Sequence, residues 1–155
     1  MSTPYDRLKS LGIELPVPPT PIANFVTHVE VNGLLFLSGQ GPREADGRMH
    51  TGKVGANVSV EDAYKHARLT GVNLLAVMHT ALGDLGRVKR VVKLLGMVNC
   101  GEGFSNTPAV IHGATDTLVE IFGQEKGWHA RSAVGLYQLP GDASVEIELI
   151  VEVEG

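Results

Sequence analysis

Arg131 and Glu146 are the two side chains of this sequence whose types and positions most clearly suggest chemistry. Arg131 lies in the run Ala130-Arg131-Ser132, and Glu146 lies in the run Val145-Glu146-Ile147-Glu148. A guanidinium offers a planar fork of donors that matches a carboxylate, and a glutamate can exchange a proton with water. Held together on rigid strands, the two groups indicate a site for a small anionic substrate.

The hydrophobic pattern of the C-terminal strands predicts how these two groups lie. The last strand, 143–154, alternates a valine-rich face with a glutamate-rich face. If it forms a hairpin with strand 131–138 and Gln138 pairs with Ala143, Arg131 and Glu146 share the face that the helices leave uncovered. We therefore expect the two side chains together on that face. An ion pair between strands or subunits, with no ligand, is the structural alternative.

The elements that carry these strands can be placed from turn, cap and periodicity signals. Asn32-Gly33 predicts a type I′ hairpin between strands 25–31 and 34–38. Apolar residues at helical spacing predict a helix that starts at Ser59 and ends at Gly83. A strand over 88–98 and a second helix from Thr107-Pro108 to Gly123 follow.

The predicted order is therefore β-β-α-β-α-β-β, an α+β fold with two helices packed on one face of a mainly antiparallel sheet. The length favours a single domain over residues 1–155. Within it, residues 1–24 are expected to form a proline-rich N-terminal arm on the body.

Composition narrows the possible partners. Thirteen basic residues against seventeen acidic ones give a net charge of −4, and aromatic residues make up 5%. These values argue against nucleic acid as a partner, since basic surfaces and aromatic stacking platforms are both scarce. No apolar run approaches the ~20 residues that span a bilayer. Cys100 is the single cysteine, which suits a reducing compartment, so we expect a cytoplasmic protein without membrane contact.

The six histidines show no spacing typical of a metal site, and no metal is expected. His129 is expected to pack against the body of the protein directly before the strand that begins near residue 131. A position at the rim of the pocket is the alternative.

Three motifs together resemble the Rid (YjgF-like) family of reactive intermediate deaminases. They are the runs 37–42 (LSGQGP), 130–134 (ARSAV), and 139–140 (LP) followed by 145–148 (VEIE). The resemblance covers roughly residues 25–153. It implies a chorismate-mutase-like fold, assembly as a homotrimer and sites at the subunit interfaces. It also implies hydrolysis of small 2-imino or enamino acids to 2-keto acids and ammonia, without a metal or organic cofactor.

The same resemblance implies roles for individual residues. Arg131 would bind the carboxylate of a small metabolite, and Glu146 would orient or activate the attacking water. Ser38 and Gly39 would line the pocket with backbone groups. Three further substrate-binding positions depart from the deaminase pattern: Phe25 replaces a tyrosine, Ala133 replaces a frequent cysteine, and Asp116 lies near a usual asparagine.

Because of these departures, and because the 101–114 segment is longer than in the short deaminases, the chain resembles a longer subgroup of the family. A non-catalytic trimeric module that binds a small carboxylate metabolite is the alternative function. Ribonuclease activity, proposed for relatives, fits the acidic net charge least well.

Overall fold

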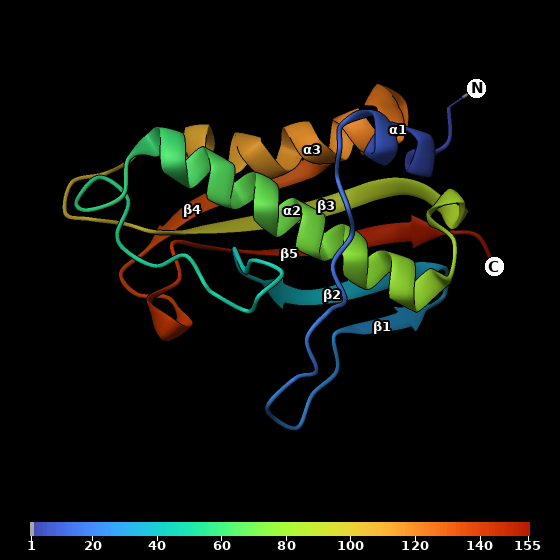
Figure 1. Cartoon of the computed structure of the whole chain (residues 1–155), viewed down its shortest axis with the longest axis horizontal. Coiled ribbons are helices and arrows are strands. Elements are labelled where there is room, and N and C mark those ends of the chain that lie inside the picture. Colours follow the sequence, from blue (N-terminus) through green and yellow to red (C-terminus); the bar gives the residue numbers. More distant parts are fainter. Residues whose placement is uncertain (1) are drawn as a thin grey trace.

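Two long helices cover one face of a five-stranded sheet in the computed structural model, which describes residues 2–155 (Figure 1). The expected α+β class and the order of the main elements are confirmed, and a short helix precedes them. The elements are α1 (Pro4–Ser10), β1 (His28–Val31), β2 (Leu34–Gln40), α2 (Val60–Leu82), the 3-10 turn η1 (Leu85–Arg87), β3 (Val88–Asn99), α3 (Thr107–Gly127), β4 (Ala130–Leu136), the turn η2 (Pro140–Asp142) and β5 (Val145–Val153).

The predicted turn and helix signals act as expected at two places. Asn32 and Gly33 both have positive φ angles, 51° and 76°, as a type I′ turn requires. At the start of α2, the Ser59 hydroxyl accepts a hydrogen bond from the backbone N–H of Asp62. At its end, Gly83 adopts the left-handed conformation with φ 76°.

Helix α3 departs from its expected ends. Asn106, and not Thr107, is the residue before the helix, and the Thr107 hydroxyl donates to the carbonyl of Ala133 in β4 instead. Gly123 interrupts the helix with φ 83° and ψ 165°, and the chain then continues helically to Gly127. The helix is therefore tied at its start to the strand that carries Arg131.

The C-terminal strands do not form the predicted hairpin. The strand order is β1-β2-β5-β3-β4, so β5 lies between β2 and β3, antiparallel to both. Strand β4 lies at the edge and pairs in parallel with β3 alone. The expected pairing of Gln138 with Ala143 was wrong, because the 139–144 segment carries the chain past β3 and does not fold it back on β4.

The apolar row of the central strand nevertheless faces the helices, as expected. Every second residue of β5 is buried, and the intervening residues lie on the uncovered face. Burial of such a row stabilises the fold by ~25 cal/mol for each Å² of apolar surface removed from water. The buried residues of this row are Val145, Ile147, Leu149, Val151 and Val153.

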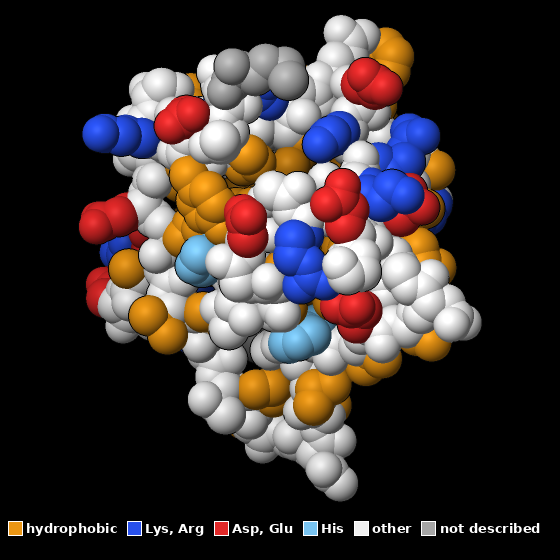
Figure 2. Space-filling view, turned by 90° about the vertical axis from the view of Figure 1, so that its right-hand side faces the viewer, with side chains coloured by type: hydrophobic (Ala, Val, Ile, Leu, Met, Phe, Trp, Pro, Cys, Tyr) orange, Lys and Arg blue, Asp and Glu red, His pale blue; other side chains and the backbone are white. Residues whose placement is uncertain are grey.

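Charges of both signs mix on the end of the molecule where the two termini lie, and no patch of one sign dominates this view (Figure 2). Within residues 2–155, no helix is both long and apolar enough to cross a membrane.

Helices α2 and α3 are in close contact at Gly113. A Cβ atom at this position would overlap the carbonyl oxygen of Tyr64 and lie 3.0 Å from the amide nitrogen of Arg68. Gly71 lies on α2 and faces α3. A Cβ atom at this position would make only ordinary contacts, the nearest with Thr117 Cβ at 3.4 Å. The two glycines thus form a matched pair with opposite tolerances.

We predict that Gly113→Ala destabilises the protein, because backbone atoms of α2 must move to admit the methyl group. Overpacking of this kind costs about 1–3 kcal/mol, which lowers the melting temperature by roughly 2–4 °C per kcal/mol in a chain of this size. Gly71→Ala should be neutral or stabilising, since alanine is the better helix former. Urea and thermal unfolding of both variants check this; equal stability of the two would contradict it.

Candidate functional site

Arg131 lies on the helix-covered side of the sheet, at its edge. Its partner on β3 is Leu94, which is fully buried under the helices, and paired residues of adjacent strands share a face. The side chain reaches helix α3, where Nη1 lies 3.0 Å from Nδ1 of His112 and donates to Oγ1 of Thr115 at 3.2 Å.

Glu146 lies on the opposite, uncovered face. Its partner across β3 is Met97, and Met97 in turn pairs with Val134 on β4, which is 40% exposed. The expectation that Arg131 and Glu146 share a face within one chain was therefore wrong. It failed because it assumed that β4 pairs directly with β5. The same geometry excludes an ion pair between the two side chains within one chain, and an ion pair between subunits stays untested.

Gly39, one of the two residues expected to line the pocket, lies against Glu146. The β2–β5 register shifts between Leu37 and Gln40, so Ser38 and Gly39 lie at an irregularity of the ladder, where a bulge is typical. A Cβ atom on Gly39 would lie 2.5 Å from Oε2 of Glu146, so the carboxylate rests directly over this glycine. Only a residue without a side chain leaves it this room.

Ser38 connects this group to the segment before β1. Its hydroxyl donates to the carbonyl of Val26 at 2.7 Å, and its amide donates to the carbonyl of Thr27. Phe25 directly precedes Val26 in the same segment and is 56% exposed. Phe25, Ser38, Gly39 and Glu146 thus belong to one part of the molecule.

The other two predicted residues lie with Arg131. Ala133 is opposite Gly96, on the same helix-covered side of β4 as Arg131. Asp116 lies one residue beyond Thr115 on α3 and accepts a hydrogen bond from the hydroxyl of Tyr64 at 2.5 Å. Arg131, Ala133 and Asp116 therefore form a second group, on the other side of the sheet from Glu146.

The two charged groups have opposite electrostatic surroundings. Burial raises the pKa of Glu146, and the neighbouring Glu148 carboxylate raises it further. Burial lowers the pKa of Arg131, partly offset by the negative charge of Asp116. Among residues 2–155, no carboxylate forms an ion pair with Arg131. The guanidinium therefore remains available to an external anion.

Sequence reasoning missed His112 and Thr115. Their spacing of three residues places both on one side of a helix, which is a signal that could have been used. Pairing with Arg131, however, depends on β4 lying beside α3, and the sequence alone does not reveal this. His129, which was given the rim of the pocket as an alternative, does lie near this group: its Nε2 is 3.1 Å from Thr115 Oγ1.

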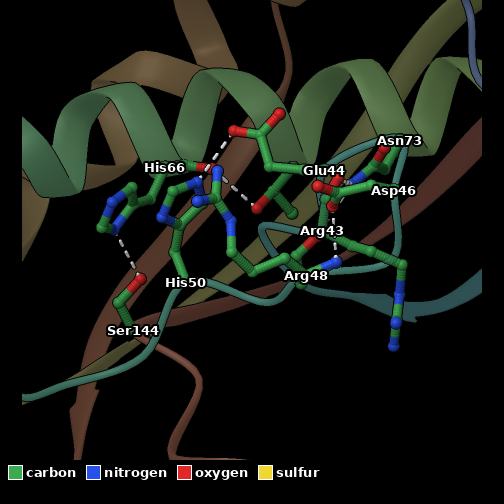
Figure 3. A network of polar contacts seen from close by, with 10 residues as sticks. Arg43, Glu44, Asp46, Arg48, His50, His66, Asn73 and Ser144 are labelled. Carbon is green, nitrogen blue, oxygen red and sulfur yellow. Dashed lines mark hydrogen bonds and ion pairs between the residues drawn. The ribbon is translucent and has the colours of Figure 1, made fainter.

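A second polar cluster connects the 41–58 loop, α2 and Ser144, the residue directly before β5 (Figure 3). The rings of His50 and His66 stack at 4.4 Å, His50 contacts Glu44 at 2.8 Å, and His66 contacts the Ser144 hydroxyl at 2.8 Å. Burial lowers the pKa of His66, and His50 lowers it further. Ser144 is fully buried, so this cluster holds the start of β5 in place and offers no nucleophile to a substrate. The described part of the chain holds no group of three or more histidine, cysteine or acidic side chains suited to a metal.

The comparison with protein families shows which family the chain belongs to. A family model described as "YjgF/chorismate_mutase-like, putative endoribonuclease" matches residues 5–153. The chain belongs to this family. The YjgF-like fold explains the sheet order and the two helices on one face, and the resemblance drawn from the three motifs is confirmed.

Three relatives place the chain within the YjgF-like family. Protein TCP17 of Trypanosoma cruzi is 42% identical over 147 residues, 95% of this chain and 92% of that protein. A 2-iminobutanoate/2-iminopropanoate deaminase of Dermatophagoides farinae is 29% identical over 143 residues, 92% of this chain and 95% of that protein. A solved structure from Shewanella oneidensis, described as a "putative endoribonuclease", is 32% identical with a TM-score of 0.94, and the match covers 98% and 100% of the two chains.

The raised pKa of Glu146 gives a test of its surroundings. A carboxyl group whose pKa is higher in the folded than in the unfolded chain costs stability as the pH rises through the folded pKa. We predict that Glu146→Gln raises the melting temperature at pH 7, and that the gain disappears below about pH 4, where the unfolded carboxyl is also protonated. Glu30→Gln, on an exposed residue of β1, is the control. A gain independent of pH would contradict the assigned cause.

Proposed function

We propose that the protein is a hydrolytic deaminase that converts small 2-imino or enamino acids to a 2-keto acid and ammonia. The named deaminase among the relatives supports this proposal, although its identity to this chain is 29%. The runs around Ser38, Arg131 and Glu146 support it as well, because the resemblance to the deaminases was drawn from them. The proposed reaction takes place in the cytoplasm and needs no cofactor.

One observation carries the proposed assembly. Arg131 and Glu146 lie on opposite faces of the sheet and two strands apart, so a small substrate cannot contact both within one chain. It can contact both where the edge strand of one protomer approaches the bulge of another. We therefore propose a site shared between neighbouring protomers of a homotrimer, with Arg131, Ala133 and Asp116 from one and Phe25, Ser38, Gly39 and Glu146 from the next.

The uncovered sheet face supports the assembly. Val29, Val31, Phe36 and Val134 are between 40% and 52% exposed, and all four lie on strands that no helix covers on that side. An apolar face of this kind is commonly covered by identical copies arranged symmetrically. Closure into a ring by such contacts would bring β4 of each protomer to its neighbour.

The chemistry follows from the two groups. Arg131 would hold the substrate carboxylate through its free donors, which orients the imine carbon. Water then adds to that carbon and one of its protons passes to the nitrogen, which gives a carbinolamine; an enamino acid first shifts a proton from nitrogen to carbon to become the imine. The C–N bond breaks as the remaining hydroxyl proton passes to the nitrogen, so ammonia leaves and the 2-keto acid remains. Glu146, whose pKa is raised toward neutrality by burial and Glu148, can accept a proton from the attacking water and return one to the nitrogen.

A non-catalytic binding module remains the second candidate, and one observation favours it. The Ser38 hydroxyl is engaged with the Val26 carbonyl, and Phe25 has no hydroxyl. Two oxygen groups that could assist a reaction are thus unavailable or missing near Glu146. Turnover measured on freshly generated 2-iminopropionate separates the two candidates: binding of a keto acid without any acceleration over buffer would favour the module.

We predict that two inactive variants restore activity when mixed. Arg131→Ala and Glu146→Gln should each lose at least tenfold in kcat/KM for 2-iminopropionate, about the effect of one charge-assisted contact. In trimers assembled at random from equal amounts, about a quarter of the interfaces combine an intact Arg131 with an intact Glu146. Mixed trimers, refolded together or produced from one cell with two tags, should therefore recover about a quarter of the wild-type rate.

Two controls accompany this experiment. Variants mixed without unfolding should stay inactive until subunits exchange, and molar mass measured by light scattering should correspond to three chains. Normal activity of Arg131→Ala alone would contradict the role of Arg131. Mixed trimers without recovered activity would contradict a site shared between protomers.

A further inference from the structure

The guanidinium of Arg131 is held in place by acceptors that carry no charge. Both hydrogens of Nη1 are engaged, one by Nδ1 of His112 at 3.0 Å and one by Oγ1 of Thr115 at 3.2 Å. Within residues 2–155, Nε and Nη2 of Arg131 have no hydrogen-bond partner. Every buried polar side-chain atom in these residues does have a partner, so Nε and Nη2 are not buried. The edge formed by Nε and Nη2 is therefore open to solvent, and this edge can bind a carboxylate through two parallel bonds.

The protons behind Thr115 have only one consistent arrangement. Nδ1 of His129 lies 2.6 Å from the carbonyl oxygen of Gly127, and a carbonyl can only accept, so Nδ1 carries the proton. In the neutral ring Nε2 is then an acceptor, and it lies 3.1 Å from Thr115 Oγ1. The Thr115 hydroxyl thus donates its proton to His129, and the lone pairs of Oγ1 remain to accept from Arg131.

The same reasoning fixes the state of His112. An arginine nitrogen can only donate, so Nδ1 of His112 must be unprotonated for the contact at 3.0 Å. Burial lowers the pKa of His129, and the charge of Arg131 lowers it further, against a smaller opposite effect from the Gly127 carbonyl. Both rings are therefore required in their neutral form.

We propose that His112, Thr115 and His129 are positioning residues that hold Arg131 for the substrate carboxylate, and that protonation of either histidine weakens carboxylate binding. The inference rests on the proposed role of Arg131. It adds that in acid the anchor loses a neutral acceptor and a protonated ring repels the guanidinium from its place, so affinity for the substrate falls as the pH falls. Histidine is the side chain whose charge changes between about pH 5 and pH 8.

The other charged side chains around this cluster are bound to other partners, so they do not supply the acceptors that His112 and His129 provide. On α3, Asp116 is bound by Tyr64 of α2 at 2.5 Å, and Glu120 is paired with Arg68 of α2. Arg90 of β3 donates to the carbonyl of Trp128. The charge of Asp116 partly offsets the lowering of the Arg131 pKa by burial, but among the described residues Asp116 forms no ion pair with the guanidinium.

The first experiment compares Thr115→Val with Thr115→Ser. Valine keeps the shape and removes the acceptor, whereas serine keeps the hydroxyl. Dissociation constants for 2-oxobutanoate, a non-reactive carboxylate, are measured at pH 7.5 by calorimetry. We expect Thr115→Val to bind about tenfold more weakly and Thr115→Ser to bind like the wild type. Thr80→Val, at an exposed position on α2, is the control for a general effect of the substitution. Equal affinity of the valine and serine variants would overturn the proposal.

The second experiment follows the same dissociation constant from pH 7.5 to pH 5.5, a range in which the ligand's carboxylate stays charged. The wild type should bind more weakly at the acid end of this range, because the neutral acceptors that support Arg131 are lost there. His112→Asn and His129→Gln retain a neutral acceptor at the position of the ring nitrogen that each replaces. The double variant should therefore bind at pH 7.5 and lose the acid dependence. A wild-type affinity that does not change with pH, or an unchanged acid dependence in the double variant, would overturn the proposal.

The two hypotheses fail in different ways. Binding of 2-oxobutanoate that depends on Arg131, without turnover of 2-iminopropionate, would exclude the deaminase and leave the positioning residues open to both experiments. If turnover occurs, kcat and KM separate the roles further: Thr115→Val should raise KM with little change in kcat. A loss in kcat with an unchanged KM would show that Thr115 does not act through substrate binding.

Discussion

The position of β5 between β2 and β3 is the constraint on which the rest of the structure depends. Its valine-rich row must face the helices to be buried, and the pleat then sends Glu146 to the other side. Because β5 occupies the centre, β4 is left at the edge with β3 as its only partner. One hydrophobic pattern thus decides where both charged groups point.

The consequence is two separate groups of functional side chains. One is built on the irregular end of β2, where Gly39 makes room for the Glu146 carboxylate. The other is built on the edge strand and on α3, where Arg131 is supported from the side by neutral acceptors. Neither group compensates the charge of the other within the chain, so each retains its capacity for an external partner.

Local signals in the sequence predicted local structure well. Asn32-Gly33, the Ser59 cap and Gly83 each act where they were expected, because these features depend on a few neighbouring residues. The pairing of β4 with β3 was not predicted, because it joins segments that lie far apart in the sequence. A short loop between two alternating strands favours a hairpin, whereas in the structure β4 pairs in parallel with β3 and contacts the start of α3 through the bond from Thr107 to Ala133. The residues of the proposed site were therefore identifiable by type, but their faces and their supports, His112 and Thr115, were not.

The contacts of α1 have a consequence for the order in which the chain can fold. Tyr5 reaches His79, 74 residues away, and Arg7 donates to the carbonyl of Ile121, 114 residues away, next to the interruption of α3 at Gly123. Helix α1 leaves the ribosome before α2 and α3, so it must wait for more than a hundred further residues before all its partners exist. Until then its apolar residue Leu8, buried in the finished fold, is exposed to water. Helix α1 is thus synthesised before its partners and can dock only after α3 has formed.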